Sequence, residues 1–418
     1  MSRILVILGV LIVLDIYAFQ AVRTISFARS LSRRIAYFSY ALLAAVSYLF
    51  VLLLSSYIIE PEERLLKAII SGFLLATYIG KFMATIVLFL EDVYRFTRWI
   101  GRKLRSGYNF LFRRHTAPIS KAEPLSRSEF LAKSSLALTA FPLISTTYGM
   151  VVGAHDYRIR KETLKLPNLP IEFDGIRITQ ISDIHSGSFF NKTAVIRGLE
   201  MIQGTKADIV VFTGDLVNNR AREIGDYFEV FNKIKAPLGV YSSLGNHDYG
   251  YRFNSDKDRE QNFKEMIELH ERLGWDLLRN ENRLLKVDNE VLSIVGVENW
   301  SANPRFPRLG DLRKALEGSQ DAPVHVLLSH DPSHWDAQVR KEFKKTDLML
   351  AGHTHGMQMG VEIGDIRWSP SQYGYKQWAG LYEENGQYLY VNRGFGYIGL
   401  PARIGMPPEI TVIELKQA

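Results

Sequence analysis

The residues LMLAGHTHGMQMG, from Leu348 to Gly360, start with four mostly apolar residues and continue directly into Gly-His-Thr-His-Gly. A short apolar run that ends at glycine is typical of a buried strand. His353 and His355 follow that strand, and imidazole is a common metal ligand in proteins. The two-residue spacing lets one short segment reach two neighbouring sites, while the flanking glycines let the chain turn sharply.

Similar apolar runs recur through the second part of the chain, after Tyr157. They alternate with longer amphipathic stretches, which predicts an α/β domain. The expected strands are 176–182, 208–213, 239–244, 292–297, 324–329, 347–352 and 388–392, and the expected helices are 192–204, 226–234, 261–273 and 310–316.

Residues with metal-binding side chains stand where five of these strands end. The ends read SDIHSG, TGDLVN, LGNHDYG, LSHDP and AGHTHG. A single Asp or Asn at such a place usually caps a helix or forms a turn, but five ends with ligand chemistry are hard to attribute to turns. In open α/β sheets, binding sites form at the carboxyl ends of the strands. The candidate metal ligands are Asp183, His185, Asp215, Asn246, His330, His353 and His355.

This ligand set mixes imidazole nitrogens with carboxylate and amide oxygens. Such a mixture suits Mn, Fe, Zn, Ni or Co better than Ca or Mg alone. Seven ligands exceed one tetrahedral site. They favour two divalent ions that share a bridging carboxylate, which is the usual device for hydrolysing phosphoesters. The chain has no cysteine, so thiol catalysis, disulfides and iron–sulfur clusters are excluded.

Five motifs resemble those of the calcineurin-like metallophosphoesterase superfamily, in order and at plausible spacing. They are D-x-H at Asp183, G-D at Gly214, G-N-H-D at Gly245, the later His330, and G-H-T-H at Gly352. More narrowly, the tail VNRGFGYIGLPARIGMPPEI and the apolar N-terminal region resemble the bacterial family named for a transmembrane protein with a metallophosphoesterase domain. That family is similar to UDP-2,3-diacylglucosamine hydrolases. The resemblance implies a four-layer α/β/β/α sandwich with the site between the strand ends.

The same resemblance implies a role for each residue of the site. Asn246, His247 and Asp248 are the expected catalytic residues. His247 would donate to the phosphoryl or leaving oxygen, and Asp248 would orient and charge its imidazole. One metal would take Asp183, His185, Asp215 and His355, the other would take Asp215, Asn246, His330 and His353, and Asp215 would bridge the two.

The N-terminal region has the pattern of a membrane protein. Three stretches, Ile4–Val22, Ile35–Ile59 and Ala68–Leu90, are almost free of charge. Each is long enough to cross ~30 Å of hydrocarbon as a helix. A fourth, Ser134–Ala154, is uncharged but richer in Ser, Thr and Gly. We therefore expect three or four membrane-spanning helices.

Charge divides the chain at the same place. Residues 1–154 carry 18 Lys/Arg and 8 Asp/Glu, whereas residues 155–418 carry 33 and 36. The C-terminal part has no basic excess of the kind that draws a protein to nucleic acid. The sequence predicts a membrane region over 1–154 and a metallophosphoesterase domain over 155–418, with membrane lipids and not nucleic acid as partners.

The loops predict the orientation, because basic loops stay in the cytoplasm. The first loop carries four arginines and no acid, the second carries Glu60, Glu62 and Glu63, and the third, 91–133, has ten basic residues against four acidic ones. The N-terminus is therefore expected outside the cytoplasmic (inner) membrane. A fourth span would put the catalytic domain outside too, and without it the domain would be cytoplasmic.

Two charged residues stand inside the predicted spans, Asp15 and Lys81. In this topology their helices run in the same direction and the two residues lie at similar depths. Intramembrane charges are costly and usually paired. We expect an ion pair between them.

Further residues are expected near the substrate. His334 follows the LSHDP motif, Asn299 ends a strand, and Arg393 and Arg403 stand among glycines where they would meet an anionic substrate. Packing or turn roles are the alternative for each. The five aromatic residues of 368–382 either pack internally or form an interfacial belt at the lipid headgroups.

Together these features predict a membrane-anchored, dinuclear metal-dependent phosphoesterase. Its substrate is expected to be a phosphodiester or pyrophosphate. In one form of this prediction, the phosphoester group is attached to a lipid. The specific alternative, a UDP-2,3-diacylglucosamine hydrolase of lipid A biosynthesis, needs a cytoplasmic site. Alternatives of other classes are a non-catalytic metal-binding membrane scaffold and a transport protein with an enzymatic appendage. Intact His247 and Asp248 argue against the scaffold, and two membrane charges offer little for a substrate path.

Overall fold

The computed structural model describes residues 2–25, 30–55, 64–112, 127–251, 253, 255–364 and 366–418. The chain forms two compact units, Met1–Thr147 and Tyr148–Ala418. The predicted domain boundary after Ala154 stays a prediction. The acidic second loop at Glu60, Glu62 and Glu63, together with Arg29 of the first, lies outside the described residues.

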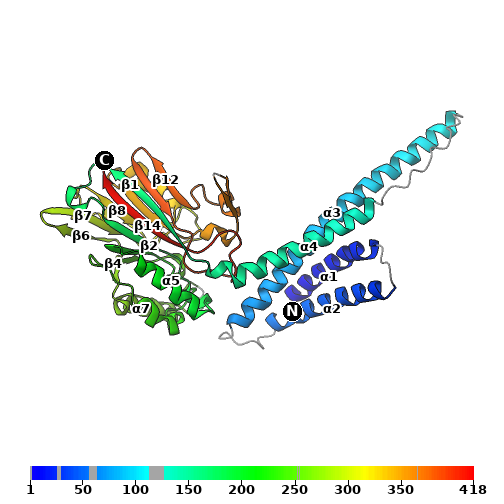
Figure 1. The fold of residues 1–418 in the computed structure, drawn as a ribbon, viewed down its shortest axis with the longest axis horizontal. Coiled ribbons are helices and arrows are strands. Elements are labelled where there is room, and N and C mark those ends of the chain that lie inside the picture. Colours follow the sequence, from blue (N-terminus) through cyan, green and yellow to red (C-terminus); the bar gives the residue numbers. More distant parts are fainter. Residues whose placement is uncertain are drawn as a thin grey trace. The chain divides into compact units, whose positions relative to one another are not determined.

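The first unit is helical. Within the described ranges, four helices of the chain are long and apolar enough to cross a membrane: α1 (Ser2–Thr24), α2 (Ser30–Ser55), α3 (Arg64–Phe112) and α4 (Arg127–Val151) (Figure 1). The last candidate span covers Lys133–His155, so the weaker fourth stretch of the sequence is a long helix in the structure. Pro142 lies inside α4.

Helix α3 corrects one expectation. The segment after Leu90 was predicted to be a loop, but the helix continues to Phe112. The continuation has strong helix formers and no proline, and Glu91 and Arg95 form an i, i+4 ion pair at 2.7 Å. Residues 113–126 of the predicted loop lie outside the described part of the chain.

The predicted pair between Asp15 and Lys81 is confirmed. Lys81 Nζ lies 2.5 Å from Asp15 Oδ1, and both side chains are buried. The hydroxyl groups of Tyr48 and Tyr78 donate to Asp15 Oδ2 at 2.6 and 3.0 Å. The carboxylate is thus paired and hydrogen-bonded, as a charge in an apolar surrounding must be.

The second unit is built on two sheets of six described strands each. Helices α5 (Lys192–Gly204) and α7 (Asp256–Leu273) lie together on one side of the first sheet (Figure 1). In sheet order, the first sheet is β1 (Arg158–Leu166), β14 (Glu409–Gln417), β2 (Arg177–Ile181), β3 (Ile209–Thr213), β4 (Val240–Ser243) and β5 (Asp276–Leu277), and the second is β12 (Gly380–Glu384), β13 (Gln387–Val391), β9 (Leu348–Ala351), β8 (His325–Leu328), β7 (Glu290–Gly296) and β6 (Glu281–Val287).

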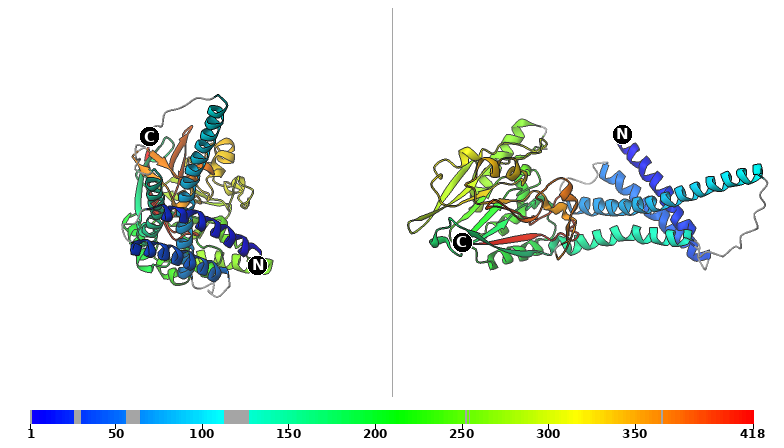
Figure 2. Two further views of the ribbon diagram at one scale, coloured as in Figure 1. Left: turned by 90° about the vertical axis from the view of Figure 1, so that its right-hand side faces the viewer. Right: turned by 90° about the horizontal axis from the view of Figure 1, so that it is seen from above.

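Most neighbouring strands near the centre of each sheet are parallel. Strands β2, β3, β4 and β5 pair in parallel in the first sheet, and β13, β9, β8 and β7 do so in the second. The red C-terminal strand β14 lies between β1 and β2 (Figures 1 and 2). The carboxyl ends of the parallel strands therefore gather at one edge of each sheet, where the sequence places its polar motifs.

Alternation along the strands produces four layers. In β3, Ile209 and Val211 face the core between the sheets, while Val210 and Phe212 face the core that contains α5 (Lys192–Gly204), α6 (Phe228–Phe231) and α7 (Asp256–Leu273). On the far side of the second sheet, Met349 of β9 packs with α8 (Leu312–Ala315) and the segment before α9 (Arg340–Glu342). Because successive strand residues point to opposite faces, each sheet is apolar on both sides. The predicted α/β/β/α sandwich is confirmed.

Three predicted helices differ in length, and the one expected over 310–316 spans only Leu312–Ala315. The helix expected over 226–234 spans only Phe228–Phe231, because Gly225 has a φ of 36° and the turn after α6 tightens to i→i−3 bonds. Helix α7 starts at Asp256, five residues earlier than expected, where the Ser255 side chain caps it. Strands β1, β5, β6, β12 and β14 and the hairpin of β10 (Val361–Ile363) and β11 (Ile366–Trp368) were not predicted.

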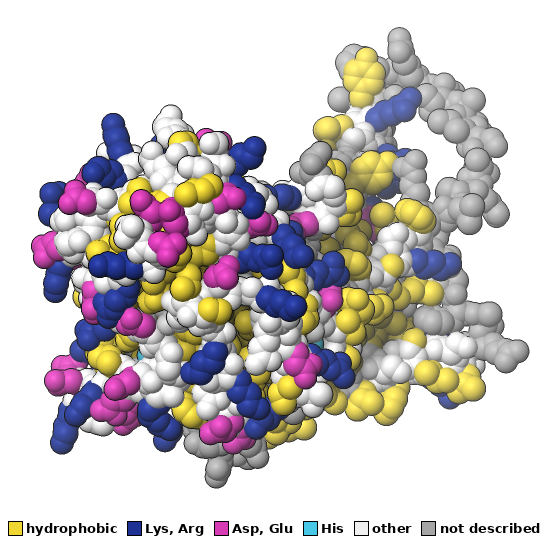
Figure 3. Space-filling view, turned by 60° about the vertical axis from the view of Figure 1, so that its left-hand side comes forward, with side chains coloured by type: hydrophobic (Ala, Val, Ile, Leu, Met, Phe, Trp, Pro, Cys, Tyr) yellow, Lys and Arg dark blue, Asp and Glu magenta, His cyan; other side chains and the backbone are white. Residues whose placement is uncertain are grey.

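The surface of the second unit carries charges of both signs. On the face drawn in Figure 3, Lys and Arg side chains alternate with Asp and Glu over this unit. This mixture agrees with the balanced charge of residues 155–418 in the sequence.

Candidate metal centre

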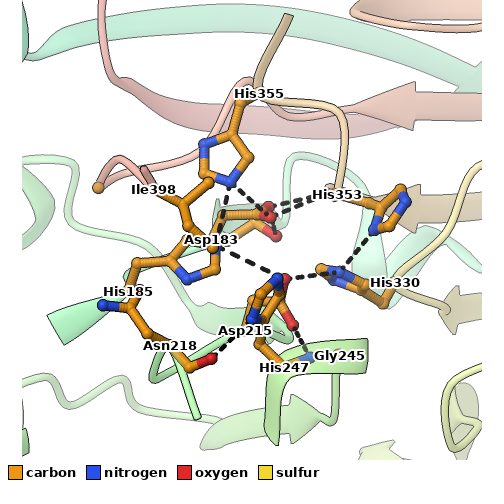
Figure 4. Close-up of polar contacts among 12 residues, drawn as sticks. Asp183, His185, Asp215, Asn218, Gly245, His247, His330, His353, His355 and Ile398 are labelled. Atoms are coloured by element: carbon orange, nitrogen blue, oxygen red, sulfur yellow. Dashed lines mark hydrogen bonds and ion pairs between the residues drawn. The ribbon is translucent and has the colours of Figure 1, made fainter. Parts of the chain in front are cut away.

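Two groups of metal-binding side chains lie at the carboxyl ends of the parallel strands. One group comes from the ends of β2 and β9, and the other from the ends of β3, β8 and β9. Within each group the ligand atoms lie within 4.8 Å of one another. The groups are Asp183, His185 and His355, and Asp215, His330 and His353 (Figure 4).

The ligands themselves turn the chain. Asp183, His185, Asp215, His353 and His355 all have positive φ, between 47° and 71°. This left-handed region is strained for residues with a Cβ, and such residues gather at functional sites. The expectation that the flanking glycines make the turn holds for Gly356, which has a φ of 54°, but His353 and His355 adopt the same unusual backbone themselves.

Glycine serves a different purpose here, which is close approach. A Cβ on Gly352 would lie 2.2 Å from Asp183 Oδ2, and one on Gly245 would lie 2.2 Å from Asp215 Oδ1. Both distances are too short for any side chain. The two carboxylates are therefore packed directly against backbone, which fixes their position.

In the first group the donor atoms point at one another. His355 Nε2 lies 3.2 Å from Asp183 Oδ1 and 3.1 Å from His185 Nε2. In the second group, His330 Nε2 lies 3.2 Å from Asp215 Oδ2 and 3.2 Å from His353 Nδ1. Ring nitrogens that converge in this way leave a point between them that suits a cation.

Asp215 links the two groups. Its Oδ2 lies 3.2 Å from His330 Nε2 of the second group and 3.5 Å from His185 Nε2 of the first. Figure 4 shows His185 and His355 on one side of the two carboxylates, and His330 and His353 on the other. The other oxygen of Asp215 accepts the backbone N–H of His247 at 2.8 Å.

Asn246 provides the clearest sign of a missing partner. Its side-chain Oδ1 is buried and has no hydrogen-bond partner in the structure. A buried carbonyl oxygen without a partner is costly. Asn246 follows β4 at the edge of the same pocket as Asp215, so this free oxygen fits a metal ligand.

Burial and mutual charge set the protonation of the second group. Burial raises the pKa of the Asp215 carboxyl, but the charges of His330 and His247 outweigh it and hold that pKa well below its usual value. Burial lowers the pKa of the His330 imidazole, but the Asp215 carboxylate outweighs it and raises that pKa to about 10. A cation bound there would displace the His330 proton, as metal binding to histidine generally does.

In the first group His185 is neutral and Asp183 is ionised. Burial lowers the pKa of His185 to about 3. Burial would raise the pKa of Asp183, but the charge of His355 and its hydrogen bond outweigh it and lower that pKa below its usual value. Neutral imidazole beside carboxylate is the state that binds a divalent cation.

His247 and Asp248 lie at the site but not in the expected pairing. His247 Nδ1 lies 2.7 Å from the carbonyl oxygen of Asn218. Because a carbonyl can only accept, Nδ1 carries the hydrogen, and Nε2 is left for the pocket. The orienting role expected of Asp248 therefore falls to the Asn218 carbonyl, which no side-chain pattern in the sequence could show.

Asp248 supports the backbone of the site instead. Its carboxylate accepts the N–H groups of Asp215 and Gly245 at 2.9 Å and of Leu216 at 2.8 Å. These bonds hold the turns after β3 and β4 together, beneath the bridging position. Burial and the nearby Asp215 raise the pKa of Asp248 to about 7.

Two residues near His353 were not predicted from the sequence to belong to the site. The hydroxyl of Tyr375 lies 2.7 Å from His353 Nε2, and Asp331 Oδ2 lies 3.5 Å from the same nitrogen. Groups of this kind orient a metal-binding imidazole. Asp331 was visible in the LSHDP motif, where only the histidine before it was assigned.

The four expected substrate residues are buried, and one of them, Arg403, contacts a candidate ligand, with its Nη2 3.3 Å from His355 Nδ1. His334 is buried, with Nδ1 2.9 Å from the Ser329 hydroxyl and Nε2 3.0 Å from Gln338 Oε1. Asn299 is buried too, and its Nδ2 donates to the Pro307 carbonyl at 2.9 Å. Both ring nitrogens of His334 and the Nδ2 of Asn299 are thus engaged inside the fold, whereas Asn299 Oδ1 is buried without a partner, and direct substrate contact stays a prediction for both.

Arg393 and Arg403 are also internal. Arg393 forms ion pairs at 2.5 Å with Glu409 and Glu362, and Arg403 donates to backbone carbonyl oxygens, among them that of Gly396. Both are buried and border a separate cavity of about 630 Å³. Their contacts hold the C-terminal loop in place, and their expected contact with an anionic substrate stays a prediction.

A pocket of about 330 Å³ opens over the ligand groups. It is lined by His185, Asp215, Asn246, His247, His353 and His355, and by a rim that includes Met357, Tyr375 and Ile398. Of the aromatic residues of 368–382, Trp378 is buried, whereas Tyr373 and Trp368 are exposed. Polar donors at the base and an apolar rim suit an amphipathic ligand.

Comparison with known families gives two matches. Residues 1–154 match the family described as "Probable Calcineurin-like phosphoesterase, transmembrane domain". Residues 176–357 match the family described as "Calcineurin-like phosphoesterase". These ranges cover the four-helix region and the segment that carries the ligand groups.

Individual proteins are similar over most of the chain. A zebrafish (Danio rerio) "Transmembrane protein with metallophosphoesterase domain" is 30% identical over 304 residues, which are 70% of this chain and 66% of that protein. The "Uncharacterized metallophosphoesterase YkuE" of Bacillus subtilis is 30% identical over 300 residues, 70% of this chain and 98% of that protein. The alignment thus spans just under two thirds of the zebrafish protein's length. These matches do not show the expected similarity to UDP-2,3-diacylglucosamine hydrolases.

Among solved structures, the Thermus sulfate thiohydrolase SoxB aligns with 59% of this chain and 57% of its own, at 13% identity and a TM-score of 0.35. A likeness this low carries no functional argument.

Proposed function

This chain belongs to the calcineurin-like phosphoesterases, and from that premise we propose that it is a two-metal hydrolase of phosphodiesters or pyrophosphates carried by a lipid. Its membership of the family makes it a membrane-associated metal-dependent phosphoesterase. The number of metals, the kind of phosphoester and the lipid are the proposal.

The position of Asp215 carries the two-metal part. One of its oxygens lies between a ring nitrogen of each ligand group, at 3.5 and 3.2 Å. The free Asn246 oxygen completes the second group. In the proposed arrangement Asp183, His185 and His355 would hold one divalent transition-metal ion, Asn246, His330 and His353 would hold the other, and Asp215 would contribute to both.

The metals, when bound, supply a water of lowered pKa and neutralise negative charge on the phosphoryl oxygens. The chain supplies the geometry. The left-handed turns and the backbone contacts at Gly352 and Gly245 keep the ligands in place before substrate arrives. His247, held at Nδ1 by the Asn218 carbonyl, presents Nε2 as the proton donor to the leaving oxygen.

The proposal is tested with the full-length protein in detergent. After chelation and reloading with Mn²⁺, we expect about two metal ions per chain and hydrolysis of bis(p-nitrophenyl) phosphate that depends on them. Chelated protein is the control. One metal per chain at full activity would contradict the two-metal part.

The lipid part is tested separately by comparing an acylated phosphodiester in mixed micelles with its deacylated form. We expect the acylated substrate to have the higher kcat/KM, by about tenfold or more, since burying acyl carbons adds binding energy. Equal values would remove the lipid from the proposal and leave the phosphoesterase intact.

The side of the membrane follows from the spans. We propose that α4 crosses the cytoplasmic membrane, which places the catalytic unit outside the cytoplasm, given cytoplasmic basic loops. A compartment-sensitive reporter fused after Ala418 should report an outside location. An inside signal would make α4 an interfacial helix and would favour the cytoplasmic UDP-2,3-diacylglucosamine hydrolase reading.

A further inference from the structure

The hairpin of β10 and β11 exposes its apolar face. Val361 pairs with Trp368, and Ile363 pairs with Ile366. Opposite residues of an antiparallel pair share a face, as do residues two apart, so these four side chains form one apolar surface. Ile363 and Ile366 are 70% and 69% exposed.

The polar face of the hairpin forms ion pairs and hydrogen bonds with the rest of the unit, although Arg367 on that face stays partly exposed. Glu362 and Arg367 are opposite each other in register, on the other face. Glu362 forms ion pairs with Arg393 at 2.5 Å and with Arg160, and Arg367 donates to the Ala379 carbonyl. Both residues border the 630 Å³ cavity that Arg393 also borders. These pairs settle which face points outward, and it is the apolar one.

A hairpin at a water-exposed surface normally turns its polar face outward, whereas this hairpin exposes its apolar face. A two-stranded hairpin alone is at best marginally stable in water, and exposed apolar patches usually mark an interaction surface. The patch continues beyond the strands through Met357, Met359 and Tyr373, which are also exposed. We call these residues, with the four of the hairpin face, the apolar surface.

Backbone hydrogen bonds tie the hairpin to the end of helix α4. Ile404 bonds in both directions with the segment before β10, through Gln358 and Gly360. The neighbouring Arg403 donates its N–H to the Gly149 carbonyl at 3.1 Å, and a Cβ on Gly153 would lie 2.0 Å from the Arg403 oxygen. Gly149 and Gly153 both belong to the candidate span Lys133–His155. The hairpin is therefore joined, through the loop at Arg403 and Ile404, to the last residues of a candidate membrane span.

We infer that the β10–β11 hairpin lies in the interfacial layer of the membrane that α4 crosses, with its apolar face among the acyl chains. The occupant of the apolar surface is the lipid bilayer. Trp368 and Tyr373 suit this depth, since Trp and Tyr gather at membrane interfaces. The short loop through Arg403 and Ile404 keeps the hairpin from moving far from the span.

This placement deepens the proposed function and rests on it for the substrate. Met357 belongs both to the apolar surface and to the rim of the pocket over the ligand groups. A phosphoester anchored by acyl chains would reach the pocket from the lipid side without leaving the membrane. The hairpin thus selects membrane-borne substrates over soluble ones.

The absence of cysteine from the sequence allows a direct test of depth. Single variants Ile363→Cys and Ile366→Cys of the full chain, labelled with an environment-sensitive dye in liposomes, should be quenched by lipids with a doxyl group on the acyl chain. The matched control is Ile171→Cys, since Ile171 is 63% exposed in the same unit. We expect at least about twofold stronger quenching at the hairpin positions, because the tip of an interfacial element sits at the acyl boundary.

Equal quenching at all three positions, or none at the hairpin, would overturn the inference. Shielding of the dye from water without quenching by lipid would show that a protein covers the surface, and would overturn it too.

A second measurement separates the hairpin from the chemistry. In liposomes, the double variant I363S/I366S should raise KM for the acylated phosphodiester by about tenfold while leaving bis(p-nitrophenyl) phosphate hydrolysis unchanged. Unchanged KM for the acylated substrate would overturn the selecting role. If the wild-type protein hydrolysed neither substrate, the proposed function would fail. The quenching experiment would still test whether the hairpin lies in the membrane interface.

Discussion

Asp215→Asn should lower phosphoester hydrolysis by about 10³-fold or more, equivalent to about 4 kcal/mol of transition-state stabilisation. The reason is the position of one oxygen between the two ligand groups, 3.2 Å from His330 Nε2 and 3.5 Å from His185 Nε2. A neutral amide at that place has one oxygen, no charge, and a weak hold on two cations.

The variant should fold, which keeps the measurement interpretable. Asp215 has a φ of 61°, and Asn tolerates this left-handed conformation as well as Asp does. The amide oxygen can still accept the His247 N–H that Asp215 Oδ1 accepts now. A loss of activity would then report the loss of the bridge and not of the fold.

The measurement is metal content and kcat on the same purified sample. We expect fewer than two metal ions per chain, and the matched control is Asp226→Asn, an exposed aspartate of the same unit, which should keep both metals and full activity. A variant of Asp215 with two metals and normal turnover would rule out the bridging role.

The second large effect is expected from His247→Ala, which should reduce kcat by about 10²–10⁴-fold while both metals stay bound. The His247 ring belongs to neither ligand group, and the backbone N–H that contacts Asp215 Oδ1 is kept in alanine. Binding of metal and binding of a proton donor are therefore separable in this site.

A comparison of two leaving groups would show which oxygen His247 protonates or hydrogen-bonds. If its Nε2 protonates the leaving oxygen, the loss should be large for an alkyl phosphodiester and small for bis(p-nitrophenyl) phosphate, whose leaving group needs no proton. Equal losses on both substrates would move the role of His247 to the phosphoryl oxygen. Normal turnover on both would remove it from the mechanism.

Much of the site was accessible from the sequence because the information is local. A strand is marked by a short apolar run, and the residue at its end is adjacent in the chain, so Asp183, Asp215 and His330 could be placed at strand ends without a structure. The membrane helices and the Asp15–Lys81 pair follow from length, charge and the regular rise of a helix.

Other features depend on contacts between distant segments, and these only the folded chain decides. The partner of His247 is the backbone carbonyl of Asn218, 29 residues away. Because every residue has a backbone carbonyl, no sequence motif can identify this partner. Arg393 reads as a free cation until β14 places Glu409 2.5 Å from it. Burial then turns a candidate substrate contact into an internal ion pair.

The hairpin shows the same division most clearly. Its sequence alternates apolar and polar residues, as any half-buried strand does, and this pattern determines that one face is apolar. Which face points outward is decided by Glu362, whose ion pairs with Arg160 and Arg393 join segments about 200 and 30 residues away. The local sequence determines which face of the hairpin is apolar. The ion pairs between distant segments determine that this face points outward.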